Sequence, residues 1–396
     1  LGMSAKATMM LAQGLYETGH ITYMRTDSTN LAEKFLVEVQ TYLSSSLGAA
    51  YATGAKRYQT TKKGAQEAHE AIRPTDITKH PDLLKTSLEP RAWKLYDLIW
   101  RRTLASQMPA AELKRTSVDI EAKEHIFRSN GSTIVFDGFM RIYQSAKETL
   151  LPTLAIGDHV KAKTITPTQH FTEPPARYSD ATLVKTLEEF GIGRPSTYAP
   201  TISTIIDRGY VERDDNKRLA PTDIAGIVSD LLVEHFPQIV DYAFTAKMEN
   251  TLDEIADGTT EWIPMLKEFY VPFHASLAEK SKTLTRAEIM PERELGTDKD
   301  TGKTIRVRTG RFGPYVQLGE DLPKVSKEEK PKRASLLKSM TFETVTHEQA
   351  TRLLSLPRTL GTTTQGDPLV VSLGRFGPYI KAGTQTASLP TNISPI

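Results

Sequence analysis

The sequence has no cysteine, no long apolar run and no excess of charge of one sign. The missing cysteines exclude disulfide bridges, cysteine nucleophiles and cysteine-ligated zinc within this chain. The longest apolar stretches, such as ATMMLAQGL, are far shorter than the ~20 residues of a membrane-spanning helix. Lys and Arg number 50 and Asp and Glu 48, a net charge of +2. A protein that is basic along its whole length is excluded, whereas local basic stripes are not.

What is present suits a folded protein of several domains. Of the 396 residues, 39% are hydrophobic and 25% are charged, so core-forming side chains are plentiful. This length is typical of roughly two to four domains. The first apolar run is interrupted by Gln13, Glu17 and His20, which excludes a secretion signal. The chain begins Leu1-Gly2, inside a helical pattern and without an initiator Met, so we expect a fragment of a longer protein.

Helical spacing of apolar residues is clearest near the start of the chain. It predicts a helix over 4–18 with Ser4 as its N-cap. A second helix is predicted to begin at a cap on Ser28 or Thr29. A third is predicted over 89–107, just before a proline ends the pattern. The first part of the chain is therefore expected to be helical.

Strand patterns follow. Alternation of apolar and polar residues over 116–122, 133–143 and 159–171 predicts antiparallel strands. Helical patterns return from Asp180 onwards.

The last hundred residues contain an internal repeat. GRFGPYVQLG at 310–319 and GRFGPYIKAG at 374–383 are nearly the same sequence. They predict two tandem copies of one small β-rich module. The charged stretch 325–338 between them predicts a linker and a solvated helix.

The first motif with chemical potential is ITYMRTDST at 21–29. In an extended segment, Ile21, Tyr23 and Arg25 would share one face. The Arg25 guanidinium suits a phosphate, and a helix N-terminus following the motif would add backbone N–H donors. A phenol activated there could attack a phosphodiester and form a phosphotyrosine link. The alternative is a half-buried strand tyrosine beside a surface arginine, which the spacing alone favours.

The second motif, GAQEAHEAIRPT at 64–75, packs Glu67, His69, Glu70 and Arg73 closely together. One histidine between two carboxylates lacks the spacing of a metal site. His69 suits a phosphate contact or a role in proton transfer. A salt-bridged helix end that pairs Glu70 with Arg73 is the alternative.

The third motif, FGIGRPSTYAPTISTIIDRGYV at 190–211, brings a glycine-rich entry to a helix N-terminus with Pro195 at the first helical position. Such an N-terminus binds backbone phosphates. It lacks the Lys-Ser/Thr of a P-loop, so ATP binding is not expected. A capped helix entering a winged-type hairpin is the alternative. The candidate DNA contacts are Arg194, Ser196, Thr197 and Arg208.

The fourth motif is the repeated GRFGPY unit, in which an arginine and two aromatic residues flank a Gly-Pro turn. Such aromatic side chains stack on unpaired bases while arginine contacts phosphates. The alternative is that they form the core of a small β module. The candidate stacking residues are Phe312, Tyr315, Phe376 and Tyr379.

Together these motifs resemble the bacterial type IA DNA topoisomerases over essentially the whole chain. The resemblance rests on LGMSAKATMMLAQGLYETGHITYMRTDST, GAQEAHEAIRPT, LYDLIWRRTLASQM, FGIGRPSTYAPTISTIIDRGYV and the GRFGPY tail, in that order. By resemblance, Tyr23 matches the nucleophile that joins the 5′ phosphate of one cut strand, and Arg25 matches the arginine at that phosphate. His69 matches the histidine near the active site. The residues of the third motif match the stretch that lines the single-strand groove.

The resemblance implies a multidomain α+β fold. Residues 1–110 would form a helical domain with the catalytic tyrosine, and 111–179 a β-rich arch segment. Residues 180–288 would form a second helical domain with a winged-helix-like element, and 289–396 two small α+β C-terminal repeats. The family also has a TOPRIM domain with magnesium-binding acidic residues; this sequence does not contain it, and we expect it in the parent protein.

The resemblance also implies a function. The parent protein would relax negatively supercoiled DNA in the bacterial cytoplasm, at the nucleoid, without ATP or zinc, and with Mg²⁺ held by the TOPRIM domain. Its partner would be DNA, preferably single-stranded or negatively supercoiled, with no membrane, and we expect a monomer. This chain alone would bind single strands weakly and have little or no relaxation activity.

Two other classes remain open. A tyrosine recombinase or type IB enzyme also uses a tyrosine nucleophile, but places it near the end of the chain, after its arginines and histidine. Here Tyr23 precedes every other candidate. The second alternative is a non-catalytic single-stranded DNA-binding protein that retains the topoisomerase scaffold.

Overall fold

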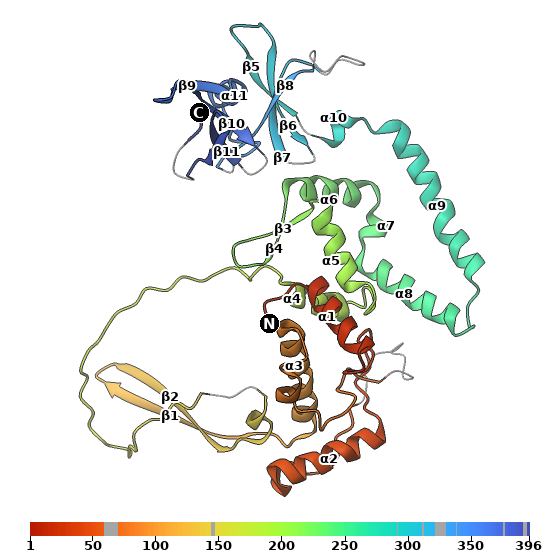
Figure 1. Ribbon diagram of the computed structural model, residues 1–396, viewed down its shortest axis with the longest axis vertical. Coiled ribbons are helices and arrows are strands. Elements are labelled where there is room, and N and C mark those ends of the chain that lie inside the picture. Colours follow the sequence, from red (N-terminus) through yellow and green to blue (C-terminus); the bar gives the residue numbers. More distant parts are fainter. Residues whose placement is uncertain are drawn as a thin grey trace. The chain divides into compact units, whose positions relative to one another are not determined.

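The structure is a computed structural model with two compact units (Figure 1). The first unit comprises Leu1–Ala176, Leu183–Glu188 and Gly193–Ile202, and the second comprises Arg177–Thr182, Glu189–Ile192 and Ser203–Ile396. The structure describes residues 1–58, 70–143, 147–290, 292–310, 313–320, 330–337, 339–374, 377–390 and 394–396.

Three helices surround the core of the first unit, namely α1 (Ala5–Glu17), α2 (Glu33–Leu47) and α3 (Pro90–Gln107). Ser4 caps α1 by accepting the N–H of Ala7, so the helix predicted over 4–18 is confirmed. The helix predicted over 89–107 is also confirmed, because the Glu89 carboxylate caps α3. The fully buried core residues include Leu15, Val39, Leu43, Tyr96 and Leu104.

Helix α2 begins later than predicted. Ser28 and Thr29 do not cap it, and the helix starts at Glu33. The Ser28 hydroxyl instead accepts the N–H of Asn30, and the N–H of Ala32 donates to Glu70 Oε1 at 2.8 Å. The start of α2 is thus fixed by a carboxylate 38 residues further along the chain. A local sequence pattern does not contain this information.

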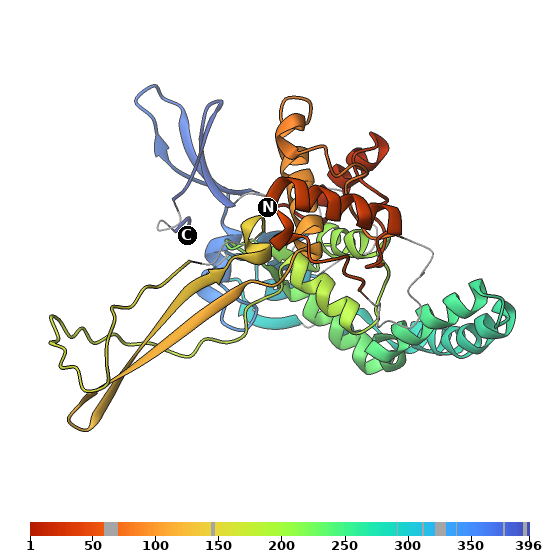
Figure 2. The same ribbon diagram turned by 90° about the horizontal axis from the view of Figure 1, so that it is seen from below.

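A long antiparallel hairpin of β1 (Glu112–Ala122) and β2 (His125–Phe136) extends away from α1–α3 (Figure 2). Its strands confirm the prediction for 116–122 and part of that for 133–143, whose remainder forms the 3₁₀ helix η3 (Gly138–Arg141). The strand predicted over 159–171 is wrong. These residues are exposed, and among the described residues no strand pairs with them, so their N–H and C=O groups form no ladder. Two further 3₁₀ turns are η1 (Ala49–Tyr51) and η2 (Pro81–Leu84).

Helices return after residue 180, as predicted. Helices α4 (Asp180–Glu189) and α5 (Tyr198–Asp207) each contribute residues to both units. A short hairpin follows, made of β3 (Val211–Arg213) and β4 (Leu219–Pro221). The helices that complete this region are α6 (Asp223–His235), α7 (Pro237–Val240), α8 (Tyr242–Ala256), α9 (Trp262–Thr283) and α10 (Arg286–Ile289). No described helix has the length and apolar character of a membrane span.

The tail contains two four-stranded antiparallel sheets, which confirms the repeat and the mixed α+β class. The first has the order β5 (Glu292–Thr297), β6 (Thr304–Gly310), β7 (Gly313–Leu318) and β8 (Lys332–Ser335). The second has the order β9 (Arg358–Thr362), β10 (Pro368–Gly374), β11 (Gly377–Ala382) and β12 (Gln385–Ser388). Helix α11 (His347–Leu354) packs on the first sheet through Ala350 and Leu353.

The charged stretch between the two repeat motifs differs from its prediction. Residues 332–335 form strand β8 and not a solvated helix. Ser335 pairs with Tyr315 of β7, so the free edge of the sheet determines the conformation of this stretch. Residues 321–329 lie outside the described part of the chain.

Candidate active site

The segment that carries Tyr23 is fastened to a second segment some 50 residues further on. The N–H of Thr22 donates to the Arg73 carbonyl at 2.9 Å, and the N–H of Thr75 donates to the His20 carbonyl at 3.1 Å. Ile21 forms an antiparallel bridge with Pro74 between these two bonds. The two motifs predicted to carry chemistry, ITYMRTDST and the end of GAQEAHEAIRPT, are therefore neighbours.

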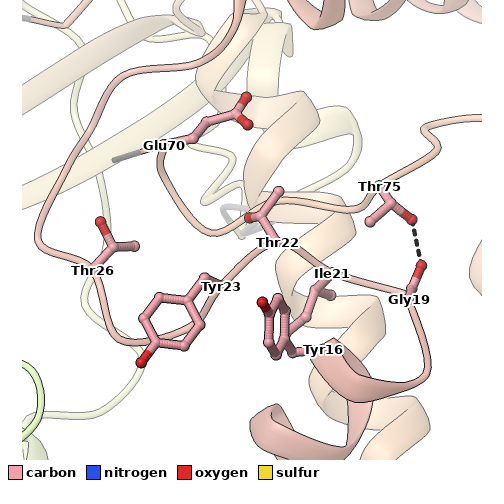
Figure 3. Close-up of a pocket in the computed structure, with 8 residues that line it drawn as sticks. All are labelled: Tyr16, Gly19, Ile21, Thr22, Tyr23, Thr26, Glu70 and Thr75. Carbon is pink, nitrogen blue, oxygen red and sulfur yellow. Dashed lines mark hydrogen bonds between the residues drawn. The ribbon is translucent and has the colours of Figure 1, made fainter. Parts of the chain in front are cut away.

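Thr22, directly before Tyr23, is the best-anchored residue of the segment. Its hydroxyl donates to the Ala71 carbonyl at 2.8 Å and accepts the N–H of Arg73 at 2.9 Å. The Thr75 hydroxyl adds a bond of 2.7 Å to the Gly19 carbonyl (Figure 3). The backbone that leads into Tyr23 is thus fixed along residues 19–22 by the segment 71–75.

Tyr23 itself is accessible. Its side chain is 41% exposed, whereas Ile21 and Met24 are 1% and 4% exposed. The prediction that Ile21 shares a face with Tyr23 and Arg25 is therefore wrong, because residues 22–25 form bends in place of a regular strand. Tyr23 and Arg25 are both exposed, as the nucleophile hypothesis requires. Among the described residues, neither side chain has a hydrogen-bond or ion-pair partner.

A second tyrosine supports the Tyr23 ring. Tyr16, in the last turn of α1, meets it edge to face, with ring centroids 5.2 Å apart at 67°. Both rings line a cleft of about 420 Å³, and the Tyr23 hydroxyl points away from Thr22 and Glu70 (Figure 3). The residues that line the cleft are Tyr16, Gly19, Ile21, Thr22, Tyr23, Thr26, Glu70 and Thr75.

Glu70 and Arg73 form the salt bridge of the alternative predicted for their motif, but residues 70–75 are not helical, so the predicted helix end is not found there. Arg73 binds both carboxylate oxygens of Glu70, at 2.6 and 2.9 Å, and its guanidinium lies 4.0 Å from the centre of the Phe35 ring. This pair is structural, because Glu70 also accepts the N–H of Ala32. His69 and Glu67 lie outside the described residues. Within the described residues, no group of three or more His, Asp or Glu side chains could hold a metal ion.

His20, two residues before Thr22, packs against the core residue Tyr96. Its imidazole meets Tyr96 edge to face, and among the described residues its buried Nδ1 has no hydrogen-bond partner. Burial, and secondarily the charge of Lys79, lower the pKa of His20 below its usual value. The neutral imidazole is therefore the form that this fold favours.

The glycine-rich motif forms the tight turn into α5 that the sequence predicts. The Arg194 carbonyl accepts the N–H groups of Thr197 and Tyr198, so Pro195 stands at the first position of the turn although regular helix begins at Tyr198. The Thr197 hydroxyl accepts the Arg194 N–H at 2.9 Å and is used within the turn. Ser196 is exposed, and so is Arg208 beyond the end of α5.

Tyr315 and Tyr379 occupy the same position in the two tail sheets. Each ring lies over a glycine of the neighbouring strand, Gly310 or Gly374, where an added Cβ would come within 2.9 or 3.0 Å of the ring. Both rings are half-buried. The other two predicted stacking residues, Phe312 and Phe376, lie outside the described residues.

Sequence reasoning missed Tyr16 and the anchoring role of Thr22. Tyr16 could have been found from the helix end at Gly19, since a chain that reverses there lays the next residues against the last helical turn. The partners of Thr22 come from residues 71–73, and no local pattern announces them.

Comparison with known proteins places these features in a family. A family model described as DNA topoisomerase matches residues 1–267, and one described as topoisomerase C-terminal repeat matches residues 298–365 and 362–395. DNA topoisomerase 1 of Xylella fastidiosa (strain Temecula1) is 42% identical over an alignment that covers 100% of this chain and 50% of the relative. DNA topoisomerase 1 of Synechococcus elongatus is 40% identical, with 96% and 50% covered.

A solved structure is similar as well. Full-length topoisomerase I from Thermotoga maritima aligns with a TM-score of 0.64 and 31% identity, over 85% of this chain and 56% of that chain. The chain thus spans about half the length of the curated relatives it matches.

Proposed function

Because this chain belongs to the bacterial type IA DNA topoisomerase family, we propose that it is the part of such an enzyme that carries the strand-cutting nucleophile. The full-length protein, which includes the region that the relatives have beyond this chain, would cut one DNA strand, let the other pass and rejoin the first. This activity would relax negatively supercoiled DNA.

Tyr23 is the proposed nucleophile. Its phenolic oxygen attacks the phosphorus of a phosphodiester in an unpaired strand, and the phenolic proton is released. A bond forms between that oxygen and the 5′ phosphate, the bond to the 3′ oxygen breaks, and the 3′ oxygen leaves as a hydroxyl. Reversal of the same exchange rejoins the strand. The phosphotyrosine keeps the energy of the broken ester, so no ATP is needed.

Arg25 is the proposed phosphate ligand. It follows Tyr23 by two residues and is exposed, like Tyr23. A guanidinium donates two parallel hydrogen bonds to phosphate oxygens and stabilises the charge that grows on them in the transition state. The alternative, a half-buried strand tyrosine beside a surface arginine, is less well supported, because Tyr23 is 41% exposed and residues 22–25 form no regular strand.

The anchors behind Tyr23 would supply positioning. Three hydrogen bonds hold Thr22 against residues 71–73, and Tyr16 limits the rotation of the Tyr23 ring. Reactions of this kind gain rate when the reacting atoms are held close to their attack geometry. His69, the residue before Glu70, remains a candidate for a phosphate contact or proton transfer.

Magnesium is expected from the family, but the described residues do not fit a site for it, since they hold no cluster of acidic side chains or histidines. We assign the metal to the region outside this chain, where it would help to position DNA for rejoining. No step above passes through it.

The remaining candidates would guide the strand. Arg194, Ser196 and Thr197 stand at the turn into α5, where the exposed Ser196 hydroxyl suits a phosphate of the DNA backbone and the half-buried Arg194 adds a positive charge. Helix α5 with the hairpin β3–β4 and helix α6 would form the winged-helix-like element, with Arg208 at its exposed turn. The tail aromatics Phe312, Tyr315, Phe376 and Tyr379 are the candidates among which one or more would stack on unpaired bases.

One observation carries the proposal: a tyrosine at the rim of a cleft, open to solvent, on a backbone segment anchored by hydrogen bonds to residues 71–75. Incubation of the full-length protein with a 3′-labelled single strand, followed by denaturation, tests it. We expect a labelled covalent adduct that the substitution Tyr23→Phe abolishes while strand binding persists. An adduct that survives Tyr23→Phe would assign the nucleophile elsewhere, and binding without any adduct would favour a non-catalytic single-strand-binding scaffold.

A further inference from the structure

The two tail sheets share one backbone plan but differ in the side chains around the equivalent tyrosine. In the first, Glu292, Arg308, Tyr315 and Ser335 stand side by side across the four strands. The next row contains Glu294, Arg306, Gln317 and Arg333. Both rows lie on the face opposite the buried Ile305 and Val307, because side chains alternate along β6.

In the second sheet the same two rows contain no acidic residue, and Lys381 is their one charged residue. Ser372, Tyr379 and Ser388 form the first row, and Thr359, Val370, Lys381 and Thr386 form the second. Thus Lys381 stands where the first sheet has Gln317, and Thr386 stands where it has Arg333. These rows lie on the face opposite the buried Val371.

In the first sheet, Tyr315 is covered. The Arg333 guanidinium lies 5.5 Å from the centre of the Tyr315 ring. Gln317, which is only 1% exposed, accepts the Arg333 Nε–H at 2.8 Å and so holds the guanidinium in place. A base that is to stack on Tyr315 must first displace this arginine.

The arginines of that face are also already paired with carboxylates. Arg308 binds Glu292 at 2.7 Å, and Arg306 pairs with Glu320 and lies 3.7 Å from Glu294. Three carboxylates along one face repel a phosphodiester backbone, and they compete with it for the two arginines.

Among the described residues, neither obstacle is found around Tyr379. Its two rows contain no carboxylate, and among the described residues no cation or aromatic ring lies against Tyr379. Lys381 is exposed and lies two residues from Tyr379 on the same strand face, a separation of about 6.5–7 Å between Cα atoms. That separation suits one nucleotide with its base on the ring and its phosphate on the ammonium group.

We propose that Tyr379 and Lys381 form the tail's binding site for an unpaired strand, and that the matching face of the first repeat is closed by Arg333 and Gln317. The proposal rests on the proposed function, in which the tail holds single-stranded DNA, and it assigns that role to one repeat. The ligand is a single-stranded oligonucleotide, recognised by a base face and one phosphate without base-edge contacts.

Fluorescence anisotropy with this chain and a labelled oligothymidylate tests the assignment. Tyr379→Leu should weaken binding by about tenfold, and Tyr379→Phe should keep it, because stacking needs the ring and not the hydroxyl. Lys381→Gln should lower the slope of log affinity against log salt by about 0.7, as expected for one lost phosphate contact on a single strand. Tyr315→Leu, the matched substitution in the first repeat, should leave affinity unchanged.

A double variant provides a control for loss of binding that is caused by unfolding. Lys381→Gln with Thr386→Arg copies the closing pair of the first repeat into the second and should weaken binding as much as Tyr379→Leu. If Tyr315→Leu weakens binding as much as Tyr379→Leu, or if the exchange has no effect, the assignment is wrong while the proposed function stands. If the unaltered chain does not bind the oligonucleotide at all, the tail's part in the proposed function fails together with the assignment.

Discussion

Tyr23 is supported by its backbone, whereas Tyr315 and Tyr379 are supported through their rings. Around Tyr23, hydrogen bonds fix the neighbouring Thr22, and within the described residues Tyr16 is the one aromatic ring packed against it. The tail tyrosines are half-buried, and each ring lies against a glycine of the next strand. A tyrosine that acts as a nucleophile needs an accessible hydroxyl on a rigid backbone. A tyrosine that stacks on a base needs a ring whose orientation is fixed by packing.

Removal of the Tyr23 hydroxyl should give the largest difference between Tyr23 and the tail tyrosines. Tyr23→Phe in the full-length protein should abolish relaxation of a negatively supercoiled plasmid and leave the melting temperature unchanged, because the hydroxyl has no partner among the described residues. Agarose gels and calorimetry measure the two effects. Tyr379→Phe is the control and should relax DNA normally. Equal activity of both variants would remove the contrast between the two regions.

Removal of the side-chain hydrogen bonds of Thr22, which anchor the backbone before Tyr23, should have the next largest effect. Thr22→Val keeps the shape but leaves the Ala71 carbonyl and the Arg73 N–H without their side-chain partner. We expect the free energy of unfolding to fall by about 1–3 kcal/mol and the rate of adduct formation to fall with it. Thr41→Val, on the exposed side of α2, should change stability by less than about 0.5 kcal/mol. Full cleavage activity of Thr22→Val would show that the anchor does not position Tyr23.

Substitution of the glycines next to the tail tyrosines tests whether ring packing holds these tyrosines in place. Gly310→Ala places a methyl group 2.9 Å from the Tyr315 ring, and Gly374→Ala places one 3.0 Å from the Tyr379 ring. Each should destabilise its sheet by at least about 1 kcal/mol in chemical denaturation. Gly226→Ala in α6, whose Cβ would meet open space, should instead stabilise by about 0.5–1 kcal/mol. If all three behave alike, ring packing over glycine does not hold the tail tyrosines.

The smallest expected effect is that of pH on the segment before Tyr23. Burial lowers the pKa of His20 in the folded state, so below about pH 6.5 the unfolded chain binds a proton more readily than the folded one. Stability is therefore complete above that pH and is lost as the pH falls towards the lowered value. The melting temperature of the first unit should decrease in mild acid, and His20→Gln should reduce this decrease. An unchanged pH dependence in the variant would contradict the assignment to His20.

The features that could be predicted from the sequence are those determined by residues close to one another in the chain. The helices at 4–18 and 89–107 and the tail repeat are encoded locally, by caps at Ser4 and Glu89 and by repeated glycine turns. Tyr23 and Arg25 are both exposed, which their predicted roles require, but the regular strand predicted to place them on one face was not found.

The errors concern partners that lie far away in the sequence. Glu70 determines where α2 begins, and the edge of β7 turns the charged stretch at 332–335 into a strand. The alternating stretch 159–171 has strand-like composition but no described neighbour to pair with. A local sequence pattern indicates which secondary structure a segment prefers, but not whether a distant partner is present to stabilise it.

The identity of the residue that becomes joined to DNA is the most direct test of this account. After the full-length protein reacts with a single strand, digestion by nuclease and protease leaves one peptide with a nucleotide attached, which tandem mass spectrometry can sequence. The account predicts the nucleotide on the phenolic oxygen of Tyr23. A nucleotide on Tyr16, or on any other residue, would contradict it.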